Sequence, residues 1–185
     1  MGTLKKDYLL SGIKVIDAAS FIAGPSAATI MSDYGAEVIK IEPQNGDSLR
    51  NLITNGRMPE GPENYCWELT SRNKKSVSLN LKDEKAHNIL IDLIKEADVF
   101  ITNMPFPIRK KLKITSDDIR PHNAKLIYAS LTGYGEVGPD ADRTAYDSVA
   151  WWARSGLMDF VRPSNNSPVA WSTPGMGDHL SLIHI

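Results

Sequence analysis

The stretch IKVIDAASFIAGPSAATIMSDYGAEVIKIE, residues 13–42, decides the fold class of this chain. One β-branched run ends at Asp17 and a second apolar run ends at Glu42, and each is typical of a buried strand. A helix is predicted between them, with Pro25 at its first position and Gly35 as a left-handed C-cap. Strand, helix and strand in such close succession form a βαβ unit, so the sequence predicts an α/β fold built on a parallel sheet.

The loop after Asp17 is the first place to look for a ligand, because open parallel sheets bind ligands where the carboxyl ends of strands meet helix N-termini. A dinucleotide-binding loop would show the pattern G-x-G-x-x-G, whereas residues 18–25 contain only Gly24. A nicotinamide cofactor is therefore not expected. The local pattern alone favours an ordinary strand-to-helix turn, so other parts of the chain have to decide.

Composition argues against several function classes. The 185 residues include 21 Lys and Arg against 22 Asp and Glu, a net charge of −1 that does not favour nucleic acid as a partner. Cys66 is the single cysteine, so no disulfide framework is expected and a reducing cytoplasm fits. No segment reaches the ~18 apolar residues of a membrane span, and the four His lack the spacing of a zinc site. We therefore expect one cytoplasmic domain without a metal or a membrane partner.

The remaining chain continues the alternation of strand and helix. Further strands are predicted at residues 76–81, 98–102 and 125–130, and further helices after Asp83, after Ser116 and at 145–157. Residues 43–63, rich in Pro and Gly, are predicted to form an irregular surface loop. The helix after Asp83 carries an apolar stripe at helical spacing, which predicts a core face of Ala86, Ile89, Leu90, Leu93, Ile94 and Ala97. In the last predicted helix, Trp151 and Trp152 are expected to pack inward.

Three features could carry chemistry, and each has a purely structural alternative. Residues 175–179 (GMGDH) place a carboxylate in a flexible turn beside an imidazole, but the pattern is also that of a glycine turn with a capping Asp. Residues 132–135 (TGYG) follow the last predicted strand, where backbone N–H groups could face an anion. A basic cluster beyond the fourth strand could bind an anion or simply be a solvated face: Arg109, Lys110, Lys111 and Lys113.

In their order along the chain, seven segments resemble the class III CoA-transferases (the CaiB/BaiF type), the family that includes formyl-CoA and carnitine CoA-transferases. The segments are AGP (23–25), GAEVIKIE (35–42), GD (46–47), NKKSVSLNL (73–81), ADVFITN (97–103), TGYGEVGPD (132–140) and GMGDH (175–179). Within the family the chain looks most like enzymes acting on 2-hydroxy acids, such as phenyllactate or 2-hydroxyisocaproate CoA-transferases. The resemblance implies a Rossmann-like parallel sheet with flanking helices, forming the N-terminal part of the family's large domain.

The resemblance also implies a reaction. The family's nucleophile is the Asp of the Gly-Asp pair, here Asp178, whose carboxylate attacks the thioester of an acyl-CoA. A mixed anhydride and the CoA thiolate form, and the thiolate then returns to the aspartyl carbonyl to give an enzyme-bound CoA thioester. A small carboxylic acid reverses these steps as the acceptor, so CoA and acyl-CoA are implied as substrates rather than as a tightly bound cofactor.

CoA binding is implied at nine positions that match the family. They are Phe21, Ile22 and Ala23 for the adenine and ribose, Leu79 and Lys82 for the adenine and a phosphate, Asn103 and Met104 for the pantetheine and the adenine edge, Lys111 for a phosphate, and Tyr134 near the pantetheine. Two departures limit the resemblance: Pro43 stands where some relatives place a phosphate-binding Arg, and Thr132 stands where formyl-CoA enzymes carry Lys. Formate is therefore not expected as the acid.

Two alternatives stay open. The family also contains α-methylacyl-CoA racemases, but their catalytic His falls at Tyr146, and a tyrosine of pKa about 10 is a poor base at neutral pH. Family members are longer chains that form interlocked homodimers, whereas residues 180–185 (LSLIHI) no longer match the family. We therefore expect residues 1–179 to be an incomplete CoA-binding large domain and residues 180–185 to be a truncated or non-native tail. An inactive CoA-binding fragment is then the second alternative.

Overall fold

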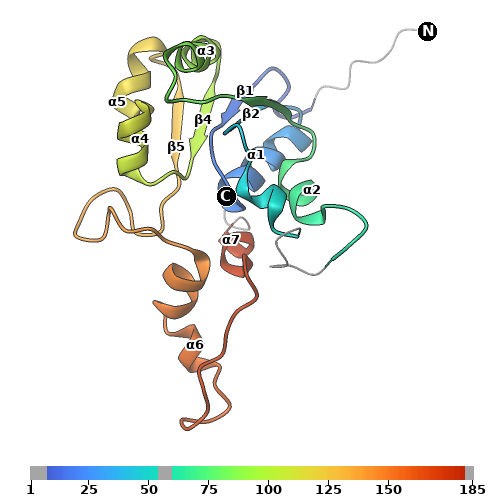
Figure 1. Cartoon of the computed structure of the whole chain (residues 1–185), viewed down its shortest axis with the longest axis vertical. Helices are drawn as coiled ribbons and strands as arrows, with labels where there is room; N and C mark the ends of the chain where they lie inside the picture. Colours follow the sequence, from blue (N-terminus) through green and yellow to red (C-terminus); the bar gives the residue numbers. More distant parts are fainter. Residues whose placement is uncertain (1–7, 54–59, 182–185) are drawn as a thin grey trace.

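The computed structural model describes residues 8–53 and 60–181, and a five-stranded parallel sheet forms the centre of this described part (Figure 1). The strands lie in the order β3-β2-β1-β4-β5. Their bounds are β1 (Lys14–Asp17), β2 (Glu37–Glu42), β3 (Lys75–Ser78), β4 (Val99–Thr102) and β5 (Ile127–Ser130). The predicted parallel sheet is confirmed. Because the strand order reverses between β1 and β4, the carboxyl ends of these two strands form a topological switch point, the place where such sheets bind ligands.

Helices cover both faces of the sheet, and the alternation of side chains along β1 separates the two cores. Ile16 and Phe100 pack against α3 (Glu84–Lys95), α4 (Phe106–Leu112) and α5 (Ser116–Ile119). The turn η2 (Arg120–His122) follows α5 and lies beside α3. Val15 and Ile101 pack on the other face against α1 (Ala23–Asp33), beside which α2 (Tyr65–Ser71) lies. The sheet is therefore buried on both sides, as parallel sheets generally are.

The first βαβ unit forms as its sequence predicts, with one correction. Gly35 has a φ of +100°, which only glycine adopts freely, and it follows α1 directly after Tyr34. Pro25 was expected at the first helical position but is the third residue, because α1 begins at Ala23 without a side-chain cap. Its missing N–H still costs nothing, since the N–H groups of a first helical turn have no partner within the helix.

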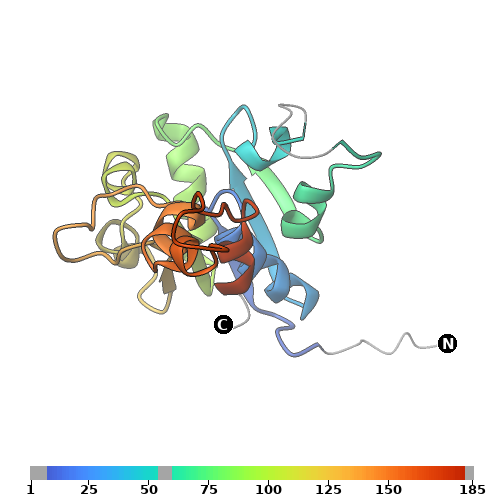
Figure 2. The same ribbon diagram turned by 90° about the horizontal axis from the view of Figure 1, so that it is seen from below.

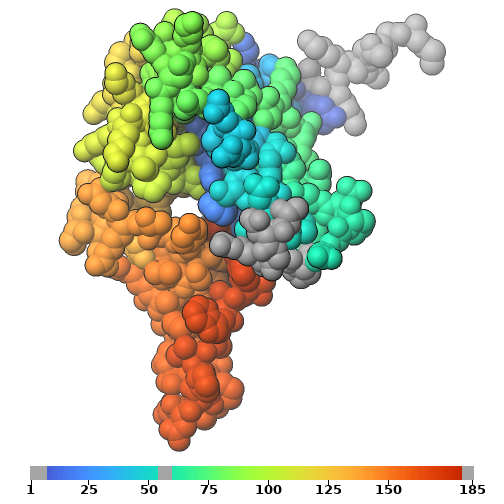
Figure 3. All heavy atoms as spheres, viewed as in Figure 1, coloured from blue at the N-terminus to red at the C-terminus, as the bar shows by residue number. Residues whose placement is uncertain are grey.

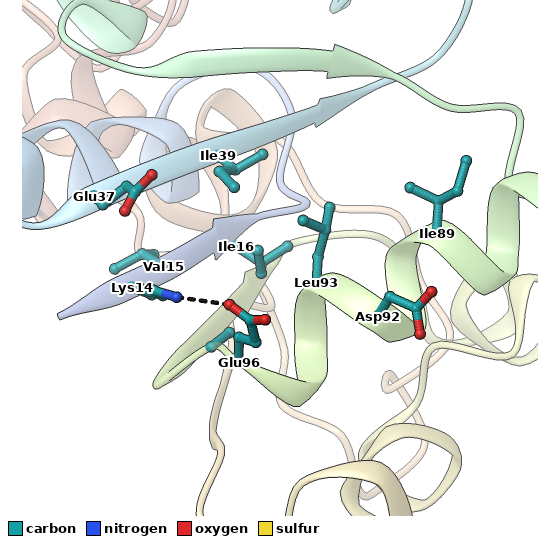
Figure 4. Close-up of a pocket in the computed structure, with 10 residues that line it drawn as sticks. Lys14, Val15, Ile16, Glu37, Ile39, Ile89, Asp92, Leu93 and Glu96 are labelled. Carbon is teal, nitrogen blue, oxygen red and sulfur yellow. Dashed lines mark hydrogen bonds and ion pairs between the residues drawn. The ribbon is translucent and has the colours of Figure 1, made fainter.

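The helix α3 begins where predicted, but its apolar stripe is narrower than predicted. Asp83 caps α3 by accepting a hydrogen bond of 3.1 Å from the backbone N–H of Ala86. Leu90 and Ile94 are fully buried, whereas Ile89, predicted to face the core, is 48 % exposed. Ile89 instead borders a hollow of about 350 Å3 between α3 and the strands β1 and β2, whose lining includes Ile16, Ile39 and Leu93 (Figure 4).

Other boundaries differ where local side chains decide them. The predicted strand 76–81 is shorter and earlier, as β3, and α2 was not predicted at all. The helix α5 is capped by Thr115 rather than by Ser116, because Thr115 and Asp118 form a reciprocal capping box. The predicted loop 43–63 contains a single 3-10 turn, η1 (Ser48–Asn51), and its residues 54–59 lie outside the described residues.

Beyond β5 the chain leaves the sheet and forms a projecting arm, which we define as residues 131–175 (Figures 1 and 3). The helix predicted at 145–157 is instead a π-helical turn, η3 (Ser148–Ala153), followed by α6 (Leu157–Phe160), and Gly156 separates the two with a φ of +81°. The arm leads back to α7 (Met176–Ser181), which lies against α1 (Figure 2). Residues 182–185 of the predicted tail lie outside the described residues.

Among residues 8–53 and 60–181, no helix combines the length and the apolar character that a membrane crossing requires.

Candidate functional site

A cavity of about 1240 Å3 lies at the carboxyl end of the sheet, between the sheet and the arm. Its walls come from the loops after β1, β4 and β5, and from η1 and α2. The arm supplies residues 141–151, and the end of the arm together with the start of α7 supplies residues 171–179. The space-filling view in Figure 3 shows the opening where the sheet part meets the arm. This is the position that the sheet topology favours for a ligand.

The loops after β1 and β4 are tied together at the switch point. Asn103 accepts a hydrogen bond of 2.9 Å from the backbone N–H of Ser20 and donates one of 2.7 Å to the carbonyl of Ser20. The next residue, Phe21, has a φ of +63°, an uncommon conformation for a residue with a side chain. The first loop therefore has a defined shape, which is more than an ordinary strand-to-helix turn requires.

Asp178 lies in the first turn of α7 and lines the cavity together with the first loop. Burial raises the pKa of Asp178 to about 6, and the nearby negative charge of Asp147 contributes to this shift. Asp147 itself accepts a hydrogen bond of 3.1 Å from the backbone N–H of Gly177. At neutral pH the Asp178 carboxylate is therefore largely ionised, yet it is more basic than an exposed carboxylate.

Two glycines around Asp178 allow segments to approach that larger residues would keep apart. A Cβ atom at Gly175 would lie 2.5 Å from Cδ1 of Ile22, and the φ of Gly175 is +79°. A Cβ atom at Gly177 would lie 2.8 Å from Cε3 of Trp151. The glycine turn that the sequence indicates is therefore present, and it brings α7 into contact with both the first loop and the arm.

Seven of the ten residues predicted for the site line this one cavity: Phe21, Ile22, Ala23, Asn103, Met104, Tyr134 and Asp178. The other three do not line it. Leu79 is buried in the core beside β3, Lys82 is exposed in the turn before α3, and Lys111 is exposed on α4. A role for these three in binding stays a prediction.

The basic cluster is not a single charged face. The side chain of Arg109 is only 1 % exposed, pairs with Glu136 at 2.6 Å, and donates a hydrogen bond of 2.7 Å to the carbonyl of Met104. Arg109 thus connects α4 to two loops that border the cavity. Sequence reasoning counted it with the surface lysines because its partner Glu136 lies far away in the sequence.

Several polar residues of this region carry no role in the sequence-based prediction. Asp147 follows directly after Tyr146, the position compared with the racemases. This adjacency was the signal in the sequence that could have indicated a role for Asp147. Beneath the first loop lie Lys40 and Asp47, both buried and 3.0 Å apart. Asp47 belongs to the GD segment at 46–47, which marked the family without indicating a function. Within the described part of the chain, no group of three or more His, Cys, Asp or Glu side chains could hold a metal ion.

Comparison with known proteins gives consistent matches. The model of CoA-transferase family III matches residues 10–184. A (R)-2-hydroxy-4-methylpentanoate CoA-transferase from Clostridioides difficile is 41 % identical over 172 residues, which is 92 % of this chain and 43 % of the relative. A cinnamoyl-CoA:phenyllactate CoA-transferase from Clostridium sporogenes is 40 % identical over 172 residues, which is 92 % of this chain and 42 % of the relative.

Among solved structures, a CAIB/BAIF family protein from Brucella suis superimposes with a TM-score of 0.77 at 26 % sequence identity. The match covers 97 % of this chain and 50 % of that protein. The chain thus spans less than half the length of the two curated relatives it matches, 43 % and 42 %.

Proposed function

We propose that the whole protein moves CoA from an acyl-CoA to a carboxylic acid, because this chain belongs to CoA-transferase family III. The proposal rests mainly on the position of Asp178. This carboxyl group has a pKa raised by burial and lies in the wall of a large cavity at the switch point of the sheet. The names of the two curated relatives favour a 2-hydroxy acid as the acceptor.

The reaction proceeds through four substitutions at carbonyl carbons. An Asp178 oxygen attacks the acyl-CoA carbonyl, and the C–S bond breaks to release CoA thiolate and leave a mixed anhydride. The thiolate attacks the aspartyl carbonyl and releases the first acid as its carboxylate, which leaves CoA bound to Asp178 as a thioester. The acceptor carboxylate then displaces the thiolate, and the thiolate attacks the acceptor's carbonyl, which regenerates the Asp178 carboxylate. No net proton is consumed.

Asp147 supports this chemistry in two ways. It anchors the first turn of α7 through the Gly177 N–H, and its charge helps to raise the pKa of Asp178. A more basic carboxylate is a better nucleophile, provided that it is still ionised at the working pH. A pKa of about 6 meets both conditions at neutral pH.

The cavity has room for the pantetheine arm and an acyl group together. Its volume of about 1240 Å3 exceeds the ~300–1,000 Å3 of ordinary small-molecule sites. Phe21, Ile22 and Met104 supply apolar wall, and Asn103 supplies a polar group near the strand ends. We propose that the adenine and ribose lie along Phe21, Ile22 and Ala23 at the edge of this cavity, with Leu79 as a further adenine contact. The phosphates then extend out of the cavity toward Lys82 and Lys111, and we regard CoA as a substrate that leaves after each turnover.

We further propose that the whole protein is a homodimer in the cytoplasm. Two large apolar side chains of the arm support a covering partner, since Phe160 is 85 % exposed and Trp171 is 83 % exposed. Light scattering of the whole protein tests this: Phe160→Asp should weaken a dimer, while Lys125→Asp on the sheet part should leave its mass unchanged. A monomeric unsubstituted protein would contradict the dimer.

The substitution Asp178→Asn in the whole protein tests the transferase proposal. It removes the nucleophile while keeping nearly the same shape, so transfer of CoA to a 2-hydroxy acid should become undetectable. Asp159→Asn is the matched control, because Asp159 is an exposed carboxylate of α6 outside the cavity lining. Transfer at the unsubstituted rate in Asp178→Asn would remove Asp178 from the mechanism.

A further inference from the structure

A network of four buried charges lies beneath the first loop. It consists of Asp17, Lys40, Asp47 and Lys74, whose side chains are each at most 3 % exposed. The Lys40 ammonium lies 3.0 Å from Asp47 and 3.6 Å from Asp17, and the Lys74 ammonium lies 2.8 Å from Asp17. Buried charges are costly unless they are paired, so two cations between two carboxylates form a set that has to stay together.

The network holds the first loop through its backbone. Lys40 donates a hydrogen bond of 2.9 Å to the carbonyl of Ala19, and Asp47 accepts one of 3.2 Å from the N–H of Phe21. Phe21 has the left-handed φ of +63°, which costs free energy in a residue with a side chain and persists only where the surroundings enforce it. The hydrogen bond from Phe21 to Asp47 is one such enforcing contact.

The conformation of Phe21 matters because the first loop lines the cavity and also contacts the Asp178 segment. The Phe21 ring meets the ring of Tyr146 edge to face, with centroids 6.0 Å apart. The next residue, Ile22, fills the space beside Gly175. A change at the buried carboxylate can therefore alter the cavity wall although Asp47 does not itself line the cavity.

We propose that Asp47 is a positioning residue for acyl-CoA: paired with Lys40, it holds Phe21 in the left-handed conformation that shapes the binding loop. This assignment rests on the proposed function, because it takes acyl-CoA as the occupant of the cavity. It gives the GD segment at 46–47 a role other than the chemistry of Asp178. It also predicts that the loop is set by a pair of charges and not by Asp47 alone.

The test uses two variants of the whole protein. Lys40→Met combined with Asp47→Leu removes both charges, so no unpaired charge remains buried and the fold should persist. Asp47→Asn keeps an oxygen that can accept the Phe21 N–H and serves as the conservative variant. The control is Asp118→Asn, which disturbs the cap of α5 away from the cavity.

The double variant should raise both the KM for acyl-CoA and the calorimetric Kd for CoA about tenfold, the effect of losing a hydrogen bond to a charged group. Asp47→Asn should raise them less, and the KM for the acid and kcat should change by less than about threefold. A purely structural role would instead lower the melting temperature and the active fraction with an unchanged KM, as expected for Asp118→Asn.

An unchanged KM for acyl-CoA in the folded double variant would overturn the assignment, and if that variant does not fold, the same measurement on Asp47→Asn decides. A different result separates the two proposals: if the unsubstituted protein neither binds CoA nor transfers it, the proposed function fails, and the role of Asp47 fails with it.

Discussion

The sheet part of the molecule, residues 8–130, and the arm, residues 131–175, are built in different ways. The sheet part buries two apolar clusters on either side of five short strands. In the arm, Trp152 is the single buried hydrophobic residue among those described, whereas Phe160 and Trp171 are exposed. The sheet part can therefore be stable through its own core, while the arm takes its position from a few specific contacts with α7, the first loop and Arg109 of α4.

The largest effect is expected where the two regions join. Gly175→Ala places a Cβ atom 2.5 Å from Cδ1 of Ile22, so the Ile22 side chain has to turn within the cavity wall or α7 and the first loop have to separate. A displacement of about 1 Å at reacting groups can cost about 100-fold in rate, and we expect a loss of that order in kcat/KM. Gly138→Ala is the matched control, because Gly138 also has a positive φ, +100°, but nothing lies within 4 Å of its added Cβ. Equal activity of the two variants would show that the contact does not position Asp178.

A smaller effect is expected at the outer surface of the sheet part. If Lys111 binds a CoA phosphate, Lys111→Ala should weaken CoA binding by ~1.5 kcal/mol, or about tenfold. Lys110→Ala, one residue earlier on the same helix, removes an equal charge and should change the affinity less. Calorimetry of CoA binding compares the two variants. Equal affinities would show that Lys111 makes no specific phosphate contact and that these lysines form a solvated face.

The pH dependence of activity tests the electrostatic contact between arm and α7. Because Asp178 has to be ionised to attack, kcat/KM should fall as the pH drops through about 6. Asp147→Asn removes a neighbouring negative charge, so the pKa of Asp178 should decrease and the acidic limb should move to lower pH. A limb that does not move in this variant would show that another group controls it.

The smallest effect on activity is expected from Glu42, which contributes to the stability of the sheet part at acidic pH. Burial by itself would raise the pKa of Glu42, but hydrogen bonds from Arg50, Ser76 and the backbone N–H of Asp47 outweigh it and lower the pKa from 4.5 to about 2. Glu42 therefore stabilises the fold above pH 4.5, and this contribution is lost as the pH falls toward 2. Glu42→Gln should flatten the dependence of the unfolding free energy on pH in this window. Denaturant titrations at several pH values measure it, and an unchanged slope would contradict the assignment.

The same contrast explains what the sequence could predict. The strands, α1 and α3 follow from local signals, namely β-branched runs, the Asp83 cap and the Gly35 stop. The burial of Arg109 was missed because its carboxylate partner, Glu136, lies in a distant loop. Family motifs indicated Asp178, whereas its raised pKa depends on burial and on Asp147, which no local pattern contains. The sequence therefore did not allow us to predict which charged residues, distant along the chain, lie next to one another in the fold.

The most direct test of the central claim is to trap the covalent intermediate on Asp178. The whole protein is incubated with acyl-CoA, treated with hydroxylamine, digested and analysed by mass spectrometry. We predict a hydroxamate on the peptide that carries Asp178, formed only when acyl-CoA is present and absent from Asp178→Asn. A protein that transfers CoA at full rate but yields no modified peptide, or yields it at another carboxylate, would contradict the account.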